Sequence, residues 1–230
     1  MYQGGVEILA HEDTKHHIKH TERIGRRILK IIPKTKNAVA PIVVLAAYAP
    51  HDGYTLGERN QHWALAQETI EQIPTANLCI WRADATGELG NRNRNGHSLR
   101  KIIGMDTMGR TKEPGNGRQM RKICTKHELT PMNTWRRQHK TTKHDPVDIS
   151  TWIHPSWSIK GKIDYIMARQ KYRNCVRKTH VTQEWRGNVE KNRHPAAVRL
   201  EIWLRLKKGY FKKPLLDTGA DVAYDLQHLG

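Results

Sequence analysis

Four side chains with acid–base or metal-binding chemistry stand at the ends of the stretches that we expect to form strands. They are Tyr48 in AAYAP, Asp84 in IWRADATGELG, Asp164 in KIDYIM and His194 in NRHPAAVRLEI. The end of a strand can hold a functional group rigidly at the edge of a sheet. Each residue alone has a simpler interpretation, since an aspartate after a strand commonly forms a turn. As a set, they are candidates for a catalytic site.

Asp164 is the hardest of the four to explain as a purely structural residue. Its neighbours in the sequence are apolar, and burying a charge without a partner is costly. A histidine is a natural partner, because a carboxylate beside an imidazole orients the ring and raises its basicity. On its own, His194 would be interpreted as a solvated residue.

Alternating strands and helices are expected to position these side chains. Pro41–Tyr48 is an apolar, β-branched run typical of a strand buried on both faces, and Glu58–Ile73 has apolar residues at helical spacing. Ala76–Trp81 predicts another buried strand, and residues 90–117 a long polar loop. Apolar residues at Met120, Ile123 and Cys124 define a second helix face. Further strands are predicted at Thr130–Trp135, Ile163–Arg169, Val176–Thr182 and Ala197–Lys207.

This order of segments predicts an α/β fold in which sheets pack together with helices outside. The 230 residues suffice for one large domain, which we place at residues 1–210, with 211–230 as a linker or tail. Three cysteines without a C-x-x-C pair argue against a disulfide framework and a thiolate zinc finger, and fit a reducing, intracellular compartment.

Positive charge is the strongest compositional feature. The formal net charge is +18, and residues 101–200 hold an excess of 14 basic over acidic residues. A phosphate backbone commonly rewards such an excess through counterion release, so nucleic acid is the expected partner. Acidic membrane lipid is the alternative, but we expect no membrane association, since no basic amphipathic helix stands out and the longest apolar stretch is too short to span a bilayer.

Candidate nucleic-acid contacts lie in two Gly- and Asn-rich segments and at one tryptophan. Arg92 and Arg94 in GNRNRNG and Arg118 in EPGNGR could contact backbone phosphates, with a solvent-exposed loop as the alternative. Trp157 could stack on an unpaired base, whereas core packing is favoured for Trp152.

A histidine-rich segment near the start of the chain is a weaker candidate. His16, His17 and His20 could share a helix face in KHHIKH. We interpret the segment as solvated and basic, because the spacing does not match a zinc-binding helix motif.

The succession GGV, AAYAP, WRADATGELG, MNTW, STWIHP, KIDYI and RHPAAVRLEI, from Gly4 to Leu206, resembles the endonuclease/exonuclease/phosphatase superfamily. Within it, the sequence is most similar to endonuclease domains of non-LTR retrotransposons and to craniofacial-development-protein-like fragments derived from them. The resemblance implies a four-layered α/β sandwich of two mixed sheets flanked by helices. It also implies phosphodiester cleavage with Mg²⁺ or Mn²⁺, a nuclear location, and possible fusion to a reverse transcriptase in the parent element.

The resemblance implies a role for each of the four candidate residues. Tyr48 matches a tyrosine that contacts the scissile phosphate, and Asp84 an aspartate that positions and deprotonates the attacking water. Asp164 matches an aspartate that orients the catalytic histidine. His194 matches that histidine, which stabilises charge developing on the phosphate.

The sequence departs from the family pattern at three places. Thr86 stands where an asparagine is expected two residues after Asp84, and Arg193 stands where an aspartate is expected before His194. The family's first strand and its metal-binding glutamate would lie upstream of Gly4, so we expect both to be missing and the metal ligands to be unknown. We therefore predict a metal-dependent endonuclease domain of retrotransposon origin with impaired catalysis. The alternative is a non-catalytic, basic remnant of the same fold that binds nucleic acid, with DNA favoured.

Overall fold

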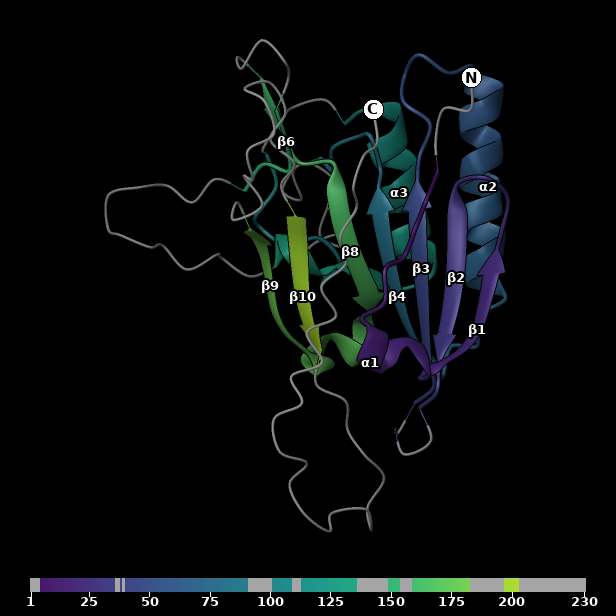
Figure 1. Cartoon of the computed structure of the whole chain (residues 1–230). Helices are drawn as coiled ribbons and strands as arrows, with labels where there is room; N and C mark the ends of the chain where they lie inside the picture. Colours follow the sequence, from purple (N-terminus) through teal and green to yellow (C-terminus); the bar gives the residue numbers. More distant parts are fainter. Residues whose placement is uncertain are drawn as a thin grey trace, which may run out of the picture.

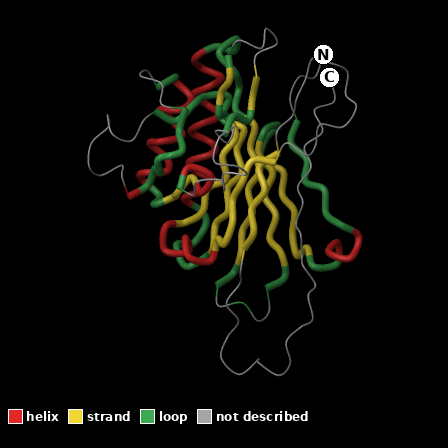
Figure 2. Tube along the Cα trace, turned by 90° about the vertical axis from the view of Figure 1, so that its left-hand side faces the viewer, coloured by secondary structure: helices red, strands yellow, loops and turns green. Residues whose placement is uncertain are grey.

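A mixed six-stranded sheet forms the framework of the computed structural model, and two long helices lie together on one side of it (Figures 1 and 2). The structure describes residues 5–35, 38, 40–90, 101–108, 113–135, 149–153, 159–182 and 197–202. The helices are α1 (Glu12–Lys15), α2 (Leu56–Glu71), α3 (Gly115–Lys126), η2 (Met132–Thr134) and η3 (Gln170–Cys175). The strands are β1 (Ile18–Arg23), β2 (Ile28–Pro33), β3 (Ile42–Tyr48), β4 (Leu78–Asp84), β5 (Leu129–Pro131), β6 (Trp152–Ile153), β7 (Lys160–Gly161), β8 (Asp164–Arg169), β9 (Val176–Thr182) and β10 (Ala197–Ile202).

The six strands lie in the order β1-β2-β3-β4-β8-β5. β3 and β4 are parallel, as expected for strands joined through a helix, and the other neighbours in this sheet are antiparallel. The parallel pair therefore lies at the centre of the sheet, where both faces are covered.

Apolar side chains of the central strands divide between the two faces. On one face, Val43, Leu45 and Trp81 pack against the helices in a core that includes Trp63 of α2 and Met120 of α3. On the other face, β3, β4 and β8 contribute a smaller cluster of Ile42, Leu78, Ile80 and Ile166. This two-sided burial confirms the strand expected at Pro41–Tyr48 and explains why its sequence is continuously apolar rather than alternating.

Helix α2 begins where the sequence supplies a capping box. The Thr55 hydroxyl accepts from the backbone N–H of Glu58, and the Glu58 carboxylate accepts from the N–H of Thr55. The helix ends at Glu71, shortly before Pro74, in agreement with the helix expected at Glu58–Ile73. This capping determines where the chain turns after β3.

Two further pairs of strands lie outside the main sheet. β9 and β10 pair antiparallel with each other, and so do β6 and β7. Thr179 of β9 donates its hydroxyl to the carbonyl of Met132, which ties the β9–β10 pair to η2. The α/β class with a mixed sheet is confirmed, while the four-layered arrangement remains a prediction.

Several expected elements have different bounds in the structure. The polar loop expected at residues 90–117 overlaps the first turn of α3, which begins at Gly115. The strand expected at Thr130–Trp135 ends at Pro131 and continues as η2, because proline has no N–H to extend a ladder. β4 runs on to Asp84, beyond the predicted end at Trp81. No helix among the described residues is long and apolar enough to cross a membrane.

The β1–β2 hairpin was not predicted. β1 is the exposed edge strand, with only Ile18 partly buried, so its sequence has no apolar alternation to reveal it. His20 lies on β1, whereas His16 and His17 precede the strand. The three histidines therefore share no helix face. All three are exposed, which agrees with the interpretation of the segment as solvated.

Candidate active site

Three of the four predicted catalytic residues lie side by side at one edge of the sheet. Tyr48, the last residue of β3, is in register with Asp84, the last residue of β4, and Asp84 is in turn the cross-strand partner of Asp164, the first residue of β8. All three side chains are partly exposed. The sheet therefore presents a phenol and two carboxylates in a row at one rim.

Strand direction explains this convergence. The parallel strands β3 and β4 end at the same edge, and the antiparallel strand β8 starts there. The backbone pairing continues just beyond the strands, since Ala49 N–H donates to Asp84 O at 2.9 Å and Ala85 N–H donates to Ile163 O at 2.8 Å. Asp84 is thus held from both sides at the end of a ladder.

Burial and one hydrogen bond control the ionisation of Asp84. Desolvation raises the pKa of its carboxyl group from 3.8 to about 6, although the backbone N–H of Thr86 and the charge of Arg82 oppose this shift. The Thr86 N–H donates to Asp84 Oδ1 at 2.9 Å. A carboxylate with a pKa near 6 can accept a proton close to neutral pH, as a general base requires.

Tyr48 stays protonated at neutral pH. Burial, followed by the negative charge of Asp84, raises the pKa of its phenol, and Arg27 opposes the shift. The Arg27 guanidinium lies over the rings of Tyr48 and Tyr54, with its Cζ 5.0 and 4.8 Å from the two centroids. Tyr48 can therefore offer a hydroxyl donor beside the Asp84 carboxylate.

The backbone of Asp164 is held by two side chains from other segments. The Thr151 hydroxyl accepts from the N–H groups of Ile163 and Asp164 at 3.0 and 3.1 Å. The Asn133 amide donates to Asp164 O at 2.8 Å and accepts from Ile166 N–H at 3.4 Å. The Asn133 side chain thus makes hydrogen bonds to the backbone of β8 beyond Pro131, where the backbone pairing of β5 with β8 ends.

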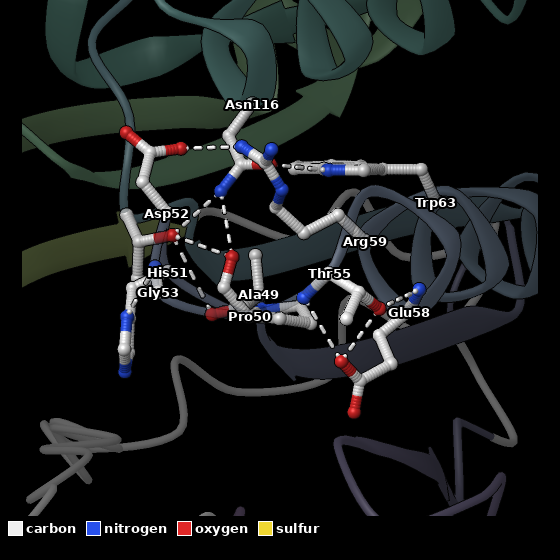
Figure 3. A network of polar contacts seen from close by, with 11 residues as sticks. Ala49, Pro50, His51, Asp52, Gly53, Thr55, Glu58, Arg59, Trp63 and Asn116 are labelled. Carbon is white, nitrogen blue, oxygen red and sulfur yellow. Dashed lines mark hydrogen bonds and ion pairs between the residues drawn. The ribbon is translucent and has the colours of Figure 1, made fainter.

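The loop after Asp84 is joined to α3 by a network of buried polar groups. The Asn116 amide nitrogen donates to Thr86 Oγ1 at 2.7 Å and to Pro50 O at 2.8 Å, while its oxygen accepts from Trp63 Nε1 at 2.9 Å. Figure 3 shows Asn116 between Pro50 and Trp63. The segments that follow β3 and β4 are therefore tied to the same residue.

Backbone packing reinforces this connection. A Cβ atom on Gly117 would lie 2.0 Å from the carbonyl oxygen of Glu88. A Cβ atom on Gly87 would lie 2.8 Å from the backbone nitrogen of Gly117. Only glycine permits so close an approach, so the loop after β4 rests directly on the first turn of α3.

The fold of this chain is similar to that of several solved structures. The 3′ phosphatase NExo from Neisseria, bound to a product DNA hairpin, aligns with a TM-score of 0.53 over 80% of this chain and 71% of that chain, at 12% identity. The catalytic domain of Xenopus laevis APE2 aligns with a TM-score of 0.51 over 79% of this chain and 56% of that one, at 16% identity. The chain has the endonuclease/exonuclease/phosphatase fold.

The remaining comparisons give one weaker structural match and no sequence match. The endonuclease domain of TRAS1, a telomere-specific non-LTR retrotransposon, aligns with a TM-score of 0.49 over 83% of this chain and 69% of that one, at 12% identity. No protein-family model matches the sequence, and comparison with curated proteins finds no match. One fold can carry different chemistries, so the arrangement of this chain's own residues decides which reaction it can support.

The two carboxylates at the rim fit a Mg²⁺ or Mn²⁺ ion. Mg²⁺ is usually bound by one or two carboxylates together with water and substrate phosphate, and Asp84 and Asp164 are adjacent and partly exposed. Among the described residues, no group of three or more His, Cys, Asp or Glu side chains gathers as a metal site. Within the part of the chain that the structure describes, Asp84 and Asp164 are therefore the carboxylates at the rim that could hold an ion.

The remaining predicted site residues divide into two groups. Arg118 is exposed on the first turn of α3, next to the residues that contact the loop after Asp84. The others lie outside the described residues: Arg92, Arg94, Trp157, Arg193 and His194. Trp152 is 38% exposed on β6 rather than in the core, so the packing role favoured for it is wrong.

Sequence reasoning missed four residues that shape the site: Arg27, Asn116, Asn133 and Thr151. Asn133 and Thr151 stand within MNTW and STWIHP, so the motifs were recognised without the roles of their polar members. Arg27 lies in a segment without apolar periodicity. Asn116 lies one helical turn before Met120, on the face of α3 that also carries Ile123, so that extending this helix toward its N-terminus places Asn116 on the buried face.

Proposed function

We propose that this chain is a divalent-metal-dependent nuclease domain that cleaves phosphodiester bonds in DNA, with impaired catalysis. The observation that carries the proposal is the row of Tyr48, Asp84 and Asp164 at one sheet edge. A phenol donor beside two carboxylates is suited to hold a phosphate and activate water. NExo and APE2 support nuclease chemistry only through their shared fold.

Each residue of the row has a distinct role in this proposal. Asp84 accepts the proton of the attacking water. Tyr48 donates a hydrogen bond to a phosphate oxygen. Asp164 orients His194, which neutralises charge on the phosphate. Asp84 and Asp164 would hold Mg²⁺ or Mn²⁺, which supplies further charge neutralisation when bound.

Impairment is proposed because of two substitutions. The Thr86 hydroxyl donates to Pro50 O at 3.2 Å and accepts from Asn116, so it is engaged within the protein where the family pattern has an asparagine. Arg193 puts a positive charge next to His194 where a carboxylate is expected, which disfavours a metal ion there. Retrotransposon descent, a former reverse transcriptase partner and a nuclear location rest on the resemblance of the sequence.

A non-catalytic DNA-binding domain is the second candidate. The excess of 14 basic residues in 101–200 favours it, because affinity for phosphates from distributed charge does not need an intact active site. Its affinity for duplex DNA should fall steeply between low and physiological salt, by about a factor of ten or more if several phosphates are contacted.

Nicking of supercoiled plasmid tests the proposal. Purified wild-type protein is compared with Asp84→Asn and with Glu68→Gln, a matched carboxylate change on an exposed position of α2, in Mg²⁺, in Mn²⁺ and in chelator. Metal-dependent nicking that survives Glu68→Gln and is lost in Asp84→Asn supports the nuclease. Folded protein that binds plasmid without nicking it supports the second candidate. If the folded protein shows no nicking and no salt-sensitive binding, both candidate functions are rejected.

A further inference from the structure

Asn116 occupies an unusual position for a buried polar side chain. It is 2% exposed on the first turn of α3, and each of its polar atoms has a partner in another segment of the chain. Asparagine near a helix start commonly caps its own helix. Here the N-cap residue is Pro114, without a side-chain cap, and the Asn116 amide is directed to the loops after β3 and β4 instead.

Trp63 sets the orientation of this amide. An indole N–H can only donate, so the Asn116 oxygen must face Trp63 Nε1, which lies 2.9 Å away. Both amide hydrogens are then left for acceptors, and the two acceptors present are Pro50 O and Thr86 Oγ1. The buried tryptophan of α2 thereby fixes which way the amide points.

Thr86 transmits the contact to Asp84. Its φ of 45° lies in the left-handed region, which is costly for a β-branched residue and persists only when its surroundings hold it. Its hydroxyl is held by Asn116 and Pro50, and in this conformation its backbone N–H donates to Asp84 Oδ1. Hydrogen bonds thus connect the Asn116 amide to Thr86, and Thr86 to the Asp84 carboxylate.

We infer that Asn116 is a positioning residue that fixes the Asp84 carboxylate through Thr86. The catalytic consequence rests on the proposed function, whereas the effect on Asp84 itself does not. Through its hydrogen bonds to Trp63 and Thr86, Asn116 connects α3 with α2 and with the loop that follows β4.

The test is the hydrogen-exchange rate of the backbone amide of residue 86, measured by NMR in the full chain. Asn116→Ala removes the amide of the Asn116 side chain, and Thr86→Val removes the hydroxyl with almost no change of shape. Both should speed exchange of the residue-86 amide by about tenfold, because its hydrogen bond to Asp84 Oδ1 is weakened. Thr86→Ser, which keeps a hydroxyl, should remain close to wild type.

Thr69→Val serves as the matched control. The Thr69 hydroxyl is also buried and donates to Leu65 O at 2.7 Å, but it lies about 20 Å along α2 from the end near the rim. This variant should leave exchange of the residue-86 amide unchanged. If Asn116→Ala fails to fold, Thr86→Val alone decides. An unchanged exchange rate of the residue-86 amide in folded Thr86→Val would overturn the inference.

Nicking separates this inference from the proposed function. In an active wild-type enzyme, kcat for nicking should fall in Thr86→Val, with plasmid affinity unchanged, and return in Thr86→Ser. If the wild type does not nick DNA, the proposed function fails, and amide exchange still decides the role of Asn116.

Discussion

Asp84 and Asp164 are direct cross-strand partners at the point where β4 ends and β8 begins. Like charges directly opposite each other in a sheet are unfavourable, and both residues are partly buried. Burial of the Asp84 carboxyl group at this position disfavours its charged form. The site is therefore predicted to reduce the stability of the protein.

Replacing Asp84 should stabilise the protein at neutral pH. Its pKa is about 6 in the folded protein against 3.8 otherwise, so folding favours the protonated form. The resulting cost is absent below pH 3.8, grows as the pH rises toward 6, and is complete above it. Asp84→Asn should therefore raise the free energy of unfolding by about 2 kcal/mol near pH 7.5 and by less near pH 4.5. Urea unfolding at both pH values measures this, and an equal change at both would contradict it.

His62 should make the protein sensitive to acid. Burial, aided by the charge of Arg27, lowers the pKa of His62 from 6.5 to about 4, so the folded state holds the neutral ring. The stabilisation is complete above pH 6.5 and is lost as the pH falls toward 4. In His62→Gln, the difference in unfolding free energy from wild type should shrink by about 2 to 3 kcal/mol over that range. A difference independent of pH would show that His62 does not titrate in this way.

Two buried threonines should respond oppositely to removal of the hydroxyl. Thr130 Oγ1 has no hydrogen-bond partner among the described residues, whereas Thr134 Oγ1 donates to Pro131 O and accepts from Gly104 N–H. Thr130→Val should raise the free energy of unfolding by about 1 kcal/mol, and Thr134→Val should lower it by about 1 to 3 kcal/mol. Chemical denaturation of the two variants measures the difference, and a loss in both would refute the assignment for Thr130.

Two glycines in the first turn of α3 form another matched pair. At Gly117 a Cβ atom would lie 2.0 Å from Glu88 O, whereas at Gly115 the nearest atom, Arg59 Nη1, is 3.8 Å away. Gly117→Ala should cost about 1 to 3 kcal/mol of stability and displace the loop after Asp84. Gly115→Ala should be neutral or slightly stabilising, since alanine favours helix. Thermal unfolding tests both, and similar melting temperatures would argue against the close contact.

The sequence alone determined the central elements and the identity of the rim residues. The continuous apolar run before Tyr48 and the capped, periodic helix after Thr55 are local signals, so β3 and α2 could be predicted. Tyr48, Asp84 and Asp164 could be selected because each stands at the end of a strand signal. The edge strand β1 could not, because a solvent-exposed strand needs no alternating pattern.

Tertiary structure alone decided how these residues meet and what supports them. Register between strands depends on long-range packing, so the row Tyr48–Asp84–Asp164 could not be read from spacing. Asparagine and glycine favour turns, so the sequence predicts a loop at Asn116. In the structure this residue is a buried hydrogen-bonding centre, 30 residues from Thr86. Such contacts leave no local trace, because a hydrogen bond between distant segments constrains only the pair of groups that the fold brings together.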